Sequence, residues 1–402
     1  MIEAVRLAVH RHPSILAARE SVQSARVSTD IARSAYYPRL NAGVGHGADS
    51  GRRSGETGTL GVSQVLYDFG KTSTTAEVAD AEVQLQEAEL QRITDEIALQ
   101  AAEAVVRTHQ YQELERLSAE QVDAVEQVLD LADKRAQAGL SREVDAMQAR
   151  SRVDAARANR WQIKAQLNEA RLTLQSLLGD ASPRRIAGLP DPDVAARAIE
   201  TTADGEDAAE IRIARAELSI AAAELRQARA QRWPTVSMDA SLDKDISGRQ
   251  SADFLEADDE PRWMVNLSWT AQGNVVNQRV RAATLAQQAA TSRVDAAALT
   301  SNDAVRGLRA LITGDVERLA ILEQRQQSIE QVRGLYREQY KLGTLSILDL
   351  LSAEQELYQA RSEWEVARHE YWTRLIGLVA ATAQTQTFYK FGADPAEPRS
   401  VQ

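Results

Sequence analysis

Cysteine is absent from this 402-residue chain, so disulfide bonds, thiolate metal sites and cysteine nucleophiles are excluded. Aromatic residues make up only 5% of the chain, too few to fill the interior of a thick globular domain. Only 9 prolines and 20 glycines interrupt the sequence. No apolar run reaches the 18 residues of a membrane-spanning helix. What these absences leave is a chain suited to long, thin helical layers.

Positive charge is also in short supply, because 47 Lys and Arg oppose 58 Asp and Glu and leave a net charge of −11. Nucleic acid is therefore not expected as a partner, since its phosphates require stripes of Lys and Arg. A negative balance is compatible with cation preference in a pore, and equally with ordinary solubility.

Groups for catalysis or cofactor binding are missing as well. The five histidines are scattered along the sequence, at His10, His12, His46, His109 and His369. No glycine-rich phosphate loop and no Ser-His-Asp set stands out. We expect no enzymatic activity, no metal and no cofactor.

Ala, Gln, Glu, Arg and Leu dominate the composition, which is typical of long helices and coiled coils. A single compact core rarely grows beyond about 250–300 residues, so the chain is elongated or divided. The first residues already form an amphipathic helical pattern, and no signal peptide is visible. If the protein is exported, we expect its leader to have been removed.

The chain contains an internal duplication. Each copy has an aromatic-proline step, two alternating stretches that end at a glycine, and a long helical segment broken by a second glycine. An aspartate lies six residues after this second glycine. The two glycines are 69 residues apart in the first copy and 70 in the second, an agreement that chance does not explain. The defining residues are Pro38, Gly70, Gly139 and Asp145 in the first copy, and Pro234, Gly273, Gly343 and Asp349 in the second.

Each copy is therefore predicted as helix, strand, strand, long helix, turn and helix. The first repeat covers 1–180, with strands at about 38–47 and 59–68, a long helix 71–137, a tip turn 138–143 and a helix 141–177. An irregular linker is expected over 181–206. The second repeat covers 207–384, with strands at about 234–243 and 262–271, a long helix 274–341, a tip turn 342–346, a helix 347–383, and a flexible tail 385–402.

Heptad spacing predicts that the long helices pack as coiled coils. In the first of them an apolar residue recurs every seven positions, at Val83, Leu90, Ile97, Ala104 and Tyr111. At about 1.5 Å per residue, such a helix is a rod of roughly 100 Å. The helix after the turn covers half of that length, so one long helix pairs with two shorter ones stacked end to end.

The strands of the second repeat have one apolar and one polar face. The apolar face, which we predict to contact lipid, consists of Val236, Met238, Ala240, Leu242, Trp263, Val265, Leu267 and Trp269. Tilted strands of about 9–11 residues span a bilayer, and Trp at both ends suits its interfaces. Four strands cannot close a cylinder, and an open edge is not tolerated in lipid. Several protomers therefore share a barrel, or the strands form a hairpin on a soluble domain.

These features together resemble the TolC-type outer-membrane efflux and secretion channels. The stretches that carry the resemblance over about residues 1–385 are Glu3–Ala8, His12–Ile15, Tyr37–Leu40, Val65–Gly70 and Tyr340–Leu351. The resemblance implies a mainly α fold with β, in which a homotrimer forms a 12-strand outer-membrane barrel on a periplasmic α-helical tunnel. It implies a Gram-negative outer membrane location and contacts with outer membrane lipid.

The implied function is that of a passive exit duct. Its partners would be a periplasmic membrane-fusion adaptor and an inner-membrane transporter, either an ABC exporter or a proton-driven pump. We favour type I protein secretion over the alternative, drug efflux. Two other classes stay open: a periplasmic adaptor, which would have one hairpin rather than two, and a soluble coiled-coil scaffold, which would not need strands flanked by Trp.

The resemblance also implies roles for the residues around the turns. The tips would close the tunnel entrance and dock the adaptor, with the residues Gly139, Leu140, Ser141, Gly343, Thr344, Leu345 and Ser346. The pore constriction is expected at Asp349 and Asp145. Asp349 matches the first aspartate ring of the family, whereas Ser352 occupies the position of the second. Leu345 stands where the family often has an Arg that pairs with an aspartate, here Asp145, and Arg142 is a candidate substitute. The alternative for both Asp145 and Asp349 is a favourable position in the first turn of a helix.

Overall fold

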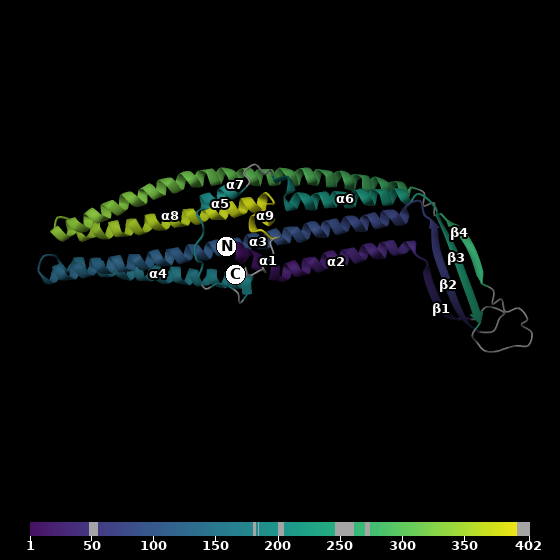
Figure 1. The fold of residues 1–402 in the computed structure, drawn as a ribbon, viewed down its shortest axis with the longest axis horizontal. Helices are drawn as coiled ribbons and strands as arrows, with labels where there is room; N and C mark the ends of the chain where they lie inside the picture. The colour runs from purple at the N-terminus through teal and green to yellow at the C-terminus, as the bar shows by residue number, and fades with distance from the viewer. Residues whose placement is uncertain are drawn as a thin grey trace, which may run out of the picture. The chain divides into compact units, whose positions relative to one another are not determined.

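The computed structural model describes residues 1–47, 55–179, 182–183, 185–199, 205–245, 261–269 and 274–391 (Figure 1). Contacts divide the chain into two units. The first unit comprises Met1–Leu16, Gln91–Ala209 and Ala298–Gln402, and the second comprises Ala17–Leu90 and Glu210–Ala297. Each unit therefore takes segments from both sequence repeats.

The fold is mainly helical with a small sheet, as the sequence predicts. The elements before the connecting segment are α1 (Ile2–Arg11), α2 (Pro13–Arg33), the 3-10 helix η1 (Ser34–Tyr36), β1 (Arg39–Gly47), β2 (Gly55–Tyr67), α3 (Lys71–Gln137) and α4 (Glu143–Leu178). Those that follow are α5 (Pro192–Ala198), η3 (Gly205–Asp207), α6 (Ala209–Ala230), β3 (Thr235–Asp245), β4 (Arg262–Ser268), α7 (Val275–Leu342), α8 (Ile347–Ala381) and α9 (Thr385–Tyr389). Within the described ranges, no helix is both long enough and apolar enough to cross a membrane.

Three expectations about local structure are wrong. The first helix breaks at His12, which is extended because a following proline disfavours the helical conformation. The linker expected to be irregular contains α5, whose first turn is capped by the Asp191 carboxylate accepting from the Asp193 amide at 3.0 Å. The tail expected to be flexible begins with α9, which buries Thr385 and Tyr389; residues 392–402 lie outside the described ranges.

The second unit contains an antiparallel sheet in the order β1-β2-β3-β4. Its register aligns apolar residues across all four strands, because Leu40 pairs with Val62, Val62 with Ala240, and Ala240 with Trp263. The rows beside it carry polar residues such as Ser63 and Asp239. Side chains alternate between faces along a strand, so one face of the sheet is mainly apolar, with Gln64 and Lys244 as polar members of it.

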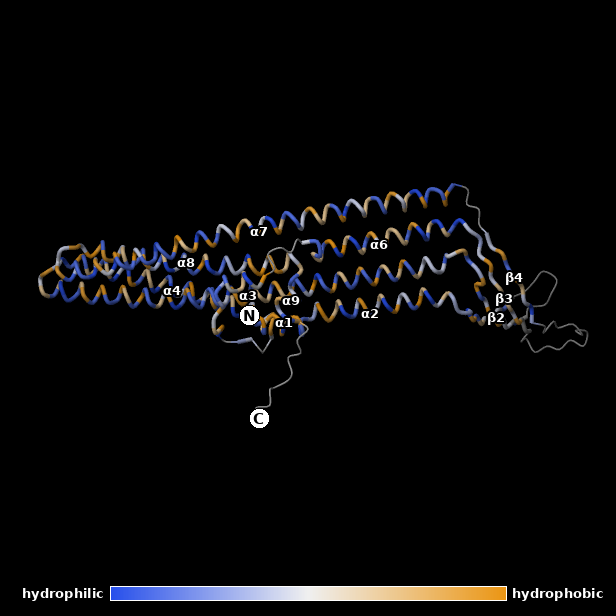
Figure 2. The backbone as a smooth tube through the Cα atoms, turned by 45° about the horizontal axis from the view of Figure 1, so that its top comes forward, coloured by the Kyte–Doolittle hydropathy of each residue, from blue (hydrophilic) through white to orange (hydrophobic). Residues whose placement is uncertain are grey.

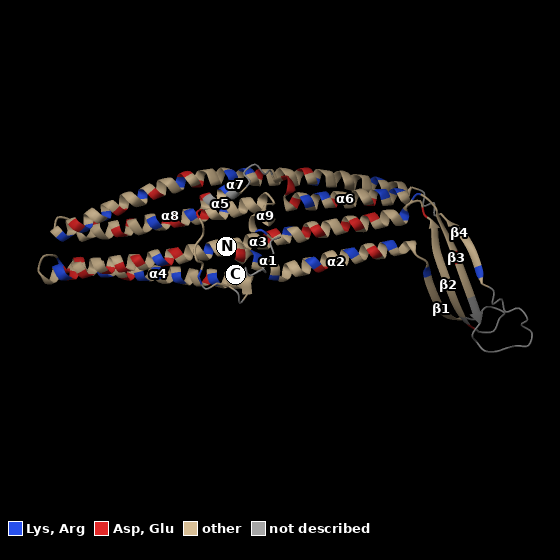
Figure 3. Ribbon diagram, viewed as in Figure 1, with Lys and Arg blue, Asp and Glu red and all other residues tan. Residues whose placement is uncertain are grey.

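Ion pairs join the helices of the second unit in the order α2, α3, α6 and α7. Arg26 and Arg33 of α2 reach Glu87 and Asp80 of α3, at 2.8 and 3.1 Å. Arg226 of α6 lies 2.6 Å from Glu77 on the same α3, and α7 joins α6 through Arg293 and Glu217 at 3.3 Å. Exposed pairs of this kind add little stability individually, but they define which helices are neighbours (Figure 3).

In the first unit, α8 is the most enclosed helix, and it contacts α4, α5 and α9. Hydrophobic residues recur along both α7 and α8 (Figure 2). Those of α8 are buried along most of its length, whereas α7 exposes much of its surface. Two ion pairs cross the antiparallel contact of these helices: Arg318 and Arg325 of α7 pair with Glu370 and Glu363 of α8. Both sets are spaced by one heptad, which is the register that antiparallel coiled-coil packing requires.

Candidate functional site

The turn between α3 and α4 is a glycine-terminated helix end. Gly139 adopts a φ of +71°, and the amides of Gly139 and Leu140 donate to the carbonyls of Ala136 and Arg135 at 3.0 and 2.8 Å. This is the Schellman arrangement that satisfies the last carbonyls of a helix. The next helix starts at once, and the Asp145 carboxylate accepts from the Arg142 amide at 3.4 Å.

The turn between α7 and α8 repeats this construction. Gly343 has a φ of +80°, and the amides of Gly343 and Thr344 donate to Tyr340 and Gln339 at 3.0 and 3.1 Å. The Ser346 hydroxyl caps α8, since it accepts from the Asp349 amide at 3.3 Å and donates to the Asp349 carboxylate at 2.9 Å. The two helix ends therefore have the same hydrogen-bond pattern, whereas the helices that follow are capped differently, by the Asp145 carboxylate in α4 and by the Ser346 hydroxyl in α8.

Arg135 connects the two turns, and sequence reasoning missed it. Its guanidinium, at the end of α3, donates to the carbonyls of Tyr340 and Lys341 at 2.9 and 3.2 Å, at the end of α7. It also lies 5.2 Å from the centre of the Tyr340 ring. A cation at a helix C-terminus is favourable, because the last carbonyls are unsatisfied and negative. The signal available in the sequence was only a basic residue in the last turn of the first long helix.

A common apolar core lies beneath both turns. Its buried members come from α3, α4, α7 and α8 and are Val125, Val128, Ala132, Ala146, Ala149, Val153, Tyr340, Ile347, Leu350 and Leu351. Burial raises the pKa of the Tyr340 hydroxyl, and the nearby Asp145 carboxylate raises it further, while Arg135 opposes both. Shared apolar packing makes the two turns one structural element, which we call the tip.

The tip residues predicted from the sequence fall into two groups. Leu140 is 68% exposed, and Leu342 beside the second glycine is 79% exposed, so both offer apolar surface to a partner. Leu345 instead packs against the shared core, and the Ser141 hydroxyl is buried. The Arg142 guanidinium lies 3.6 Å from Asp145 within the same turn.

Asp145 and Asp349 both occupy the third position of their helices, where each bonds the residue that caps the helix. Asp349 is exposed, whereas the Asp145 side chain is only 19% exposed. Capping of the helix N-terminus therefore explains the hydrogen bonds of both residues. In the single protomer, Asp349 is exposed to solvent and Asp145 is largely covered.

A groove of about 670 Å³ lies next to the tip, between α3, α7 and α8. Three carboxylates line it, from Asp123, Glu126 and Asp130, together with the cations of Arg337 and Lys341. The Arg337 guanidinium crosses from α7 to donate to the Gln127 side chain at 2.6 Å. A groove of this mixed charge differs from the mostly apolar pockets that bind small ligands.

The predicted lipid face is exposed at Met238, Leu242, Trp263, Val265 and Leu267. On the opposite face the Asp239 carboxylate accepts from Asn266 at 2.5 Å and from Ser237 at 3.2 Å. Trp269 does not belong to the strand, since β4 ends at Ser268. Its indole nitrogen donates to the Arg232 carbonyl at 3.2 Å, at the junction of helix and sheet.

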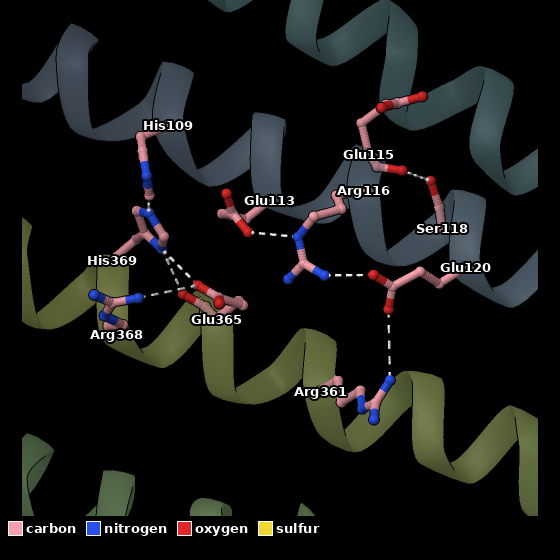
Figure 4. Close-up of polar contacts among 10 residues, drawn as sticks. All are labelled: His109, Glu113, Glu115, Arg116, Ser118, Glu120, Arg361, Glu365, Arg368 and His369. Carbon is pink, nitrogen blue, oxygen red and sulfur yellow. Dashed lines mark hydrogen bonds and ion pairs between the residues drawn. The ribbon is translucent and has the colours of Figure 1, made fainter. Parts of the chain in front are cut away.

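Two of the histidines that look scattered in the sequence meet in the first unit. The imidazoles of His109 on α3 and His369 on α8 lie 2.8 Å apart, surrounded by charged residues of the same two helices (Figure 4). Their separation by 260 positions explains why no sequence pattern connects them.

A known protein family matches the chain in two stretches, one in each sequence repeat. The family model described as outer membrane efflux protein matches residues 4–180 and 206–384. The chain is 24% identical over 361 residues to outer membrane protein TolC of Salmonella enteritidis, covering 85% of this chain and 73% of that protein. The crystal structure of the Vibrio cholerae outer membrane protein VceC is similar with a TM-score of 0.82 and 18% identity, covering 94% of this chain and 95% of VceC. The MtrE outer membrane channel of Neisseria gonorrhoeae gives 0.80 and 19%, covering 95% and 88%.

Proposed function

The chain belongs to the outer membrane efflux protein family, and from this premise we propose that three copies of it form a passive exit duct through the outer membrane. The family is one of channels rather than enzymes, and the resemblance to TolC-type proteins is confirmed. Each copy would contribute four strands to a 12-strand barrel, and its helices would form a tunnel in the periplasm of a Gram-negative bacterium. An inner-membrane transporter and a periplasmic adaptor would deliver the substrate.

The observation that carries this proposal is the apolar face of a sheet with two free edges. Among the described residues, β1 and β4 each pair on one side only. Unpaired backbone groups cost several kcal/mol each in lipid, so a sheet inserted there must pair its edges with other chains. The polar face of the same sheet, with Asp239, Asn266 and Ser237 bonded together, would then line a water-filled interior.

Arginine substitutions on the two faces test this assignment. Val265 faces the apolar side and pairs with Met238, whereas Asn266 bonds Asp239 on the other side. Val265→Arg should weaken membrane assembly by about 2–4 kcal/mol if it lies at the bilayer midplane. Asn266→Arg keeps a donor for Asp239 and should assemble. The measurement is the yield of heat-resistant trimer in outer membranes, and the opposite order of the two variants would reverse the face assignment.

For the tip, we infer adaptor docking and entrance closure. Leu140 and Leu342 supply exposed apolar surface, and the mixed-charge groove beside them supplies polar partners. Asp349, which is exposed, would form a ring of three carboxylates around the trimer axis, while Asp145 would hold the tip together near Tyr340. Like charges gathered on one axis attract cations.

For the cargo, the proposal is an exported polypeptide, with small drugs as the alternative. A deletion strain separates the two outcomes. Loss of one or more proteins from the culture medium with unchanged drug susceptibility supports polypeptide export, and the reverse pattern supports drug efflux.

A further inference from the structure

The histidine pair is a buried contact between the two hairpins of the first unit. His109 Nδ1 and His369 Nε2 are 2.8 Å apart, and only 6% and 2% of the two residues is exposed. His369 Nδ1 lies 2.7 Å from the Glu365 carbonyl oxygen, which can only accept. The His369 proton is therefore on Nδ1, so its Nε2 accepts the hydrogen bond that His109 Nδ1 donates.

We propose that this pair is a pH-sensitive clasp that holds α8 against α3 at neutral pH and releases it in mild acid. The geometry provides the reason. A neutral pair shares one proton without strain, whereas protonating both rings places two N–H groups face to face across 2.8 Å. The clasp is a property of two helices and goes beyond the proposed duct, since it does not depend on conduction.

Charged groups from both helices surround the pair (Figure 4). On α3, Glu113 pairs with Arg116 at 2.9 Å, and Arg116 continues to Glu120 at 2.5 Å. On α8, Arg368 lies 4.0 Å from the Glu365 carboxylate, which is itself 3.7 Å from His369. Glu113 and Glu120 share Arg116, so their charge is partly neutralised. Glu365 is the nearest carboxylate to His369, and burial raises the pKa of that carboxyl, which weakens it as a counter-ion for an imidazolium.

In the part of the chain that the structure describes, the acidic groups that α4, α5 and α7 bring to this stretch, or pair with there, already have partners. From α4, a backbone carbonyl of Ala170 accepts from Thr108, and Arg160 is paired with Glu115 at 3.1 Å. From α7, the arginines 318 and 325 are paired with glutamates 370 and 363 of α8. From α5, Asp193 accepts from the Tyr371 hydroxyl at 3.2 Å.

Burial lowers the pKa of His369 to about 4, and Arg368 and His109 add to this, while the Glu365 carbonyl and Glu113 oppose it. Burial lowers the pKa of His109 as well. Once α8 and α3 separate, both rings return to an ordinary value of about 6.5. The closed state therefore binds fewer protons, so closure is fully favoured above about pH 6.5 and weakens as the pH falls from there toward about 4.

The expected size follows from this linkage. Each histidine contributes up to about tenfold per pH unit to the ratio of separated to closed molecules. Burial raises the pKa of the Glu365 carboxyl, which acts with the opposite sign in the more acidic range. Neutral contacts on the same interface do not titrate in this range: Gln121 donates to Gln355 at 2.7 Å, and Asn159 to the Tyr358 oxygen at 2.8 Å.

Distance measurements between spin labels test the clasp directly. The chain has no cysteine, so Arg152→Cys on α4, the helix that forms a hairpin with α3, and Glu356→Cys on α8 provide two exposed labelling sites in each protomer. Labelled chains are diluted with unlabelled chains, so that the distance within one protomer is measured. In the purified, detergent-solubilised protein we expect one distance distribution at pH 7.5. At pH 5.5 a second population with a longer distance should appear. Its ratio to the closed population should be up to about a hundredfold higher than at pH 7.5, because each of the two rings contributes up to about tenfold over this interval.

The H109Q/H369Q double variant should keep the pH 7.5 distribution at both pH values, because glutamine offers a donor and an acceptor but does not titrate. His10→Gln, at an exposed position of α1, is the matched control and should behave as the parent. An unchanged parent distribution between pH 7.5 and 5.5 overturns the clasp, and so does a double variant that responds as strongly as the parent. If the double variant misfolds, the parent titration alone decides. Transport is not measured, so failure of the clasp and failure of the duct are distinguishable.

Discussion

Arg135→Met removes the cation that connects the two turns while keeping most of the apolar side chain. The native guanidinium makes two charge-assisted hydrogen bonds to carbonyls of Tyr340 and Lys341 and contacts the Tyr340 ring. Such hydrogen bonds contribute about 1.5–3 kcal/mol when buried, and partial exposure of Arg135 reduces this. A cation–π contact of this type adds about 0.5–1 kcal/mol. We expect a local loss of about 1.5–3 kcal/mol at the end of α7.

Hydrogen exchange is the assay that reports this loss locally. The amides of Gly343 and Thr344 close the last turn of α7, and their protection should fall by roughly 10–100-fold, since 1.4 kcal/mol is a factor of ten. Lys134→Met is the matched control, because Lys134 pairs only with Asp130 of its own helix at 2.6 Å and such pairs contribute about 0.3–0.5 kcal/mol. Unchanged protection in Arg135→Met, or an equal loss in Lys134→Met, would refute the role assigned to Arg135.

Two further predictions concern the tip. Asp349→Asn should reduce cation preference in planar bilayers and weaken block by multivalent cations, whereas Asp145→Asn, at the equivalent helix position, should loosen the tip with less effect on selectivity. Unchanged selectivity in Asp349→Asn, together with lower thermal stability, would leave Asp349 as a helix cap only. Leu140→Asp and Leu342→Asp should each abolish export while the trimers stay intact. Leu172 is 66% exposed on α4, and Leu172→Asp, the control, should leave export unchanged. Normal export from the tip variants would exclude docking there.

Patterns local in sequence predicted most of the elements. Equal spacing of the glycines pointed to two long helices, and alternation of apolar residues pointed to β3 and β4. The break at His12 had a local signal in Pro13, which the helical pattern on both sides of it obscured. Local pattern could not reveal the packing of α9, because that packing depends on burial of Tyr389 by distant segments. Short helices are stabilised by tertiary contacts more than by their own propensity.

The site was only partly accessible to sequence reasoning, for the same reason. Gly139 and Gly343 were identified as the breaks that end the two long helices, and in the structure both adopt a positive φ, which favours glycine. Arg135 and the histidine pair escaped notice, since each acts across 205 or more positions of sequence. No periodicity within one helix indicates which residue of another helix it meets.

The most direct test of the account is the mass of the purified protein in mild detergent. Among the described strands, β1 and β4 each leave one edge unpaired, and a sheet with such edges and an apolar outer face requires strand pairing between copies in the membrane. Light scattering corrected for bound detergent should give three times the chain mass of 44.2 kDa. A stable, folded monomer that keeps its sheet would contradict the shared barrel and the duct built on it.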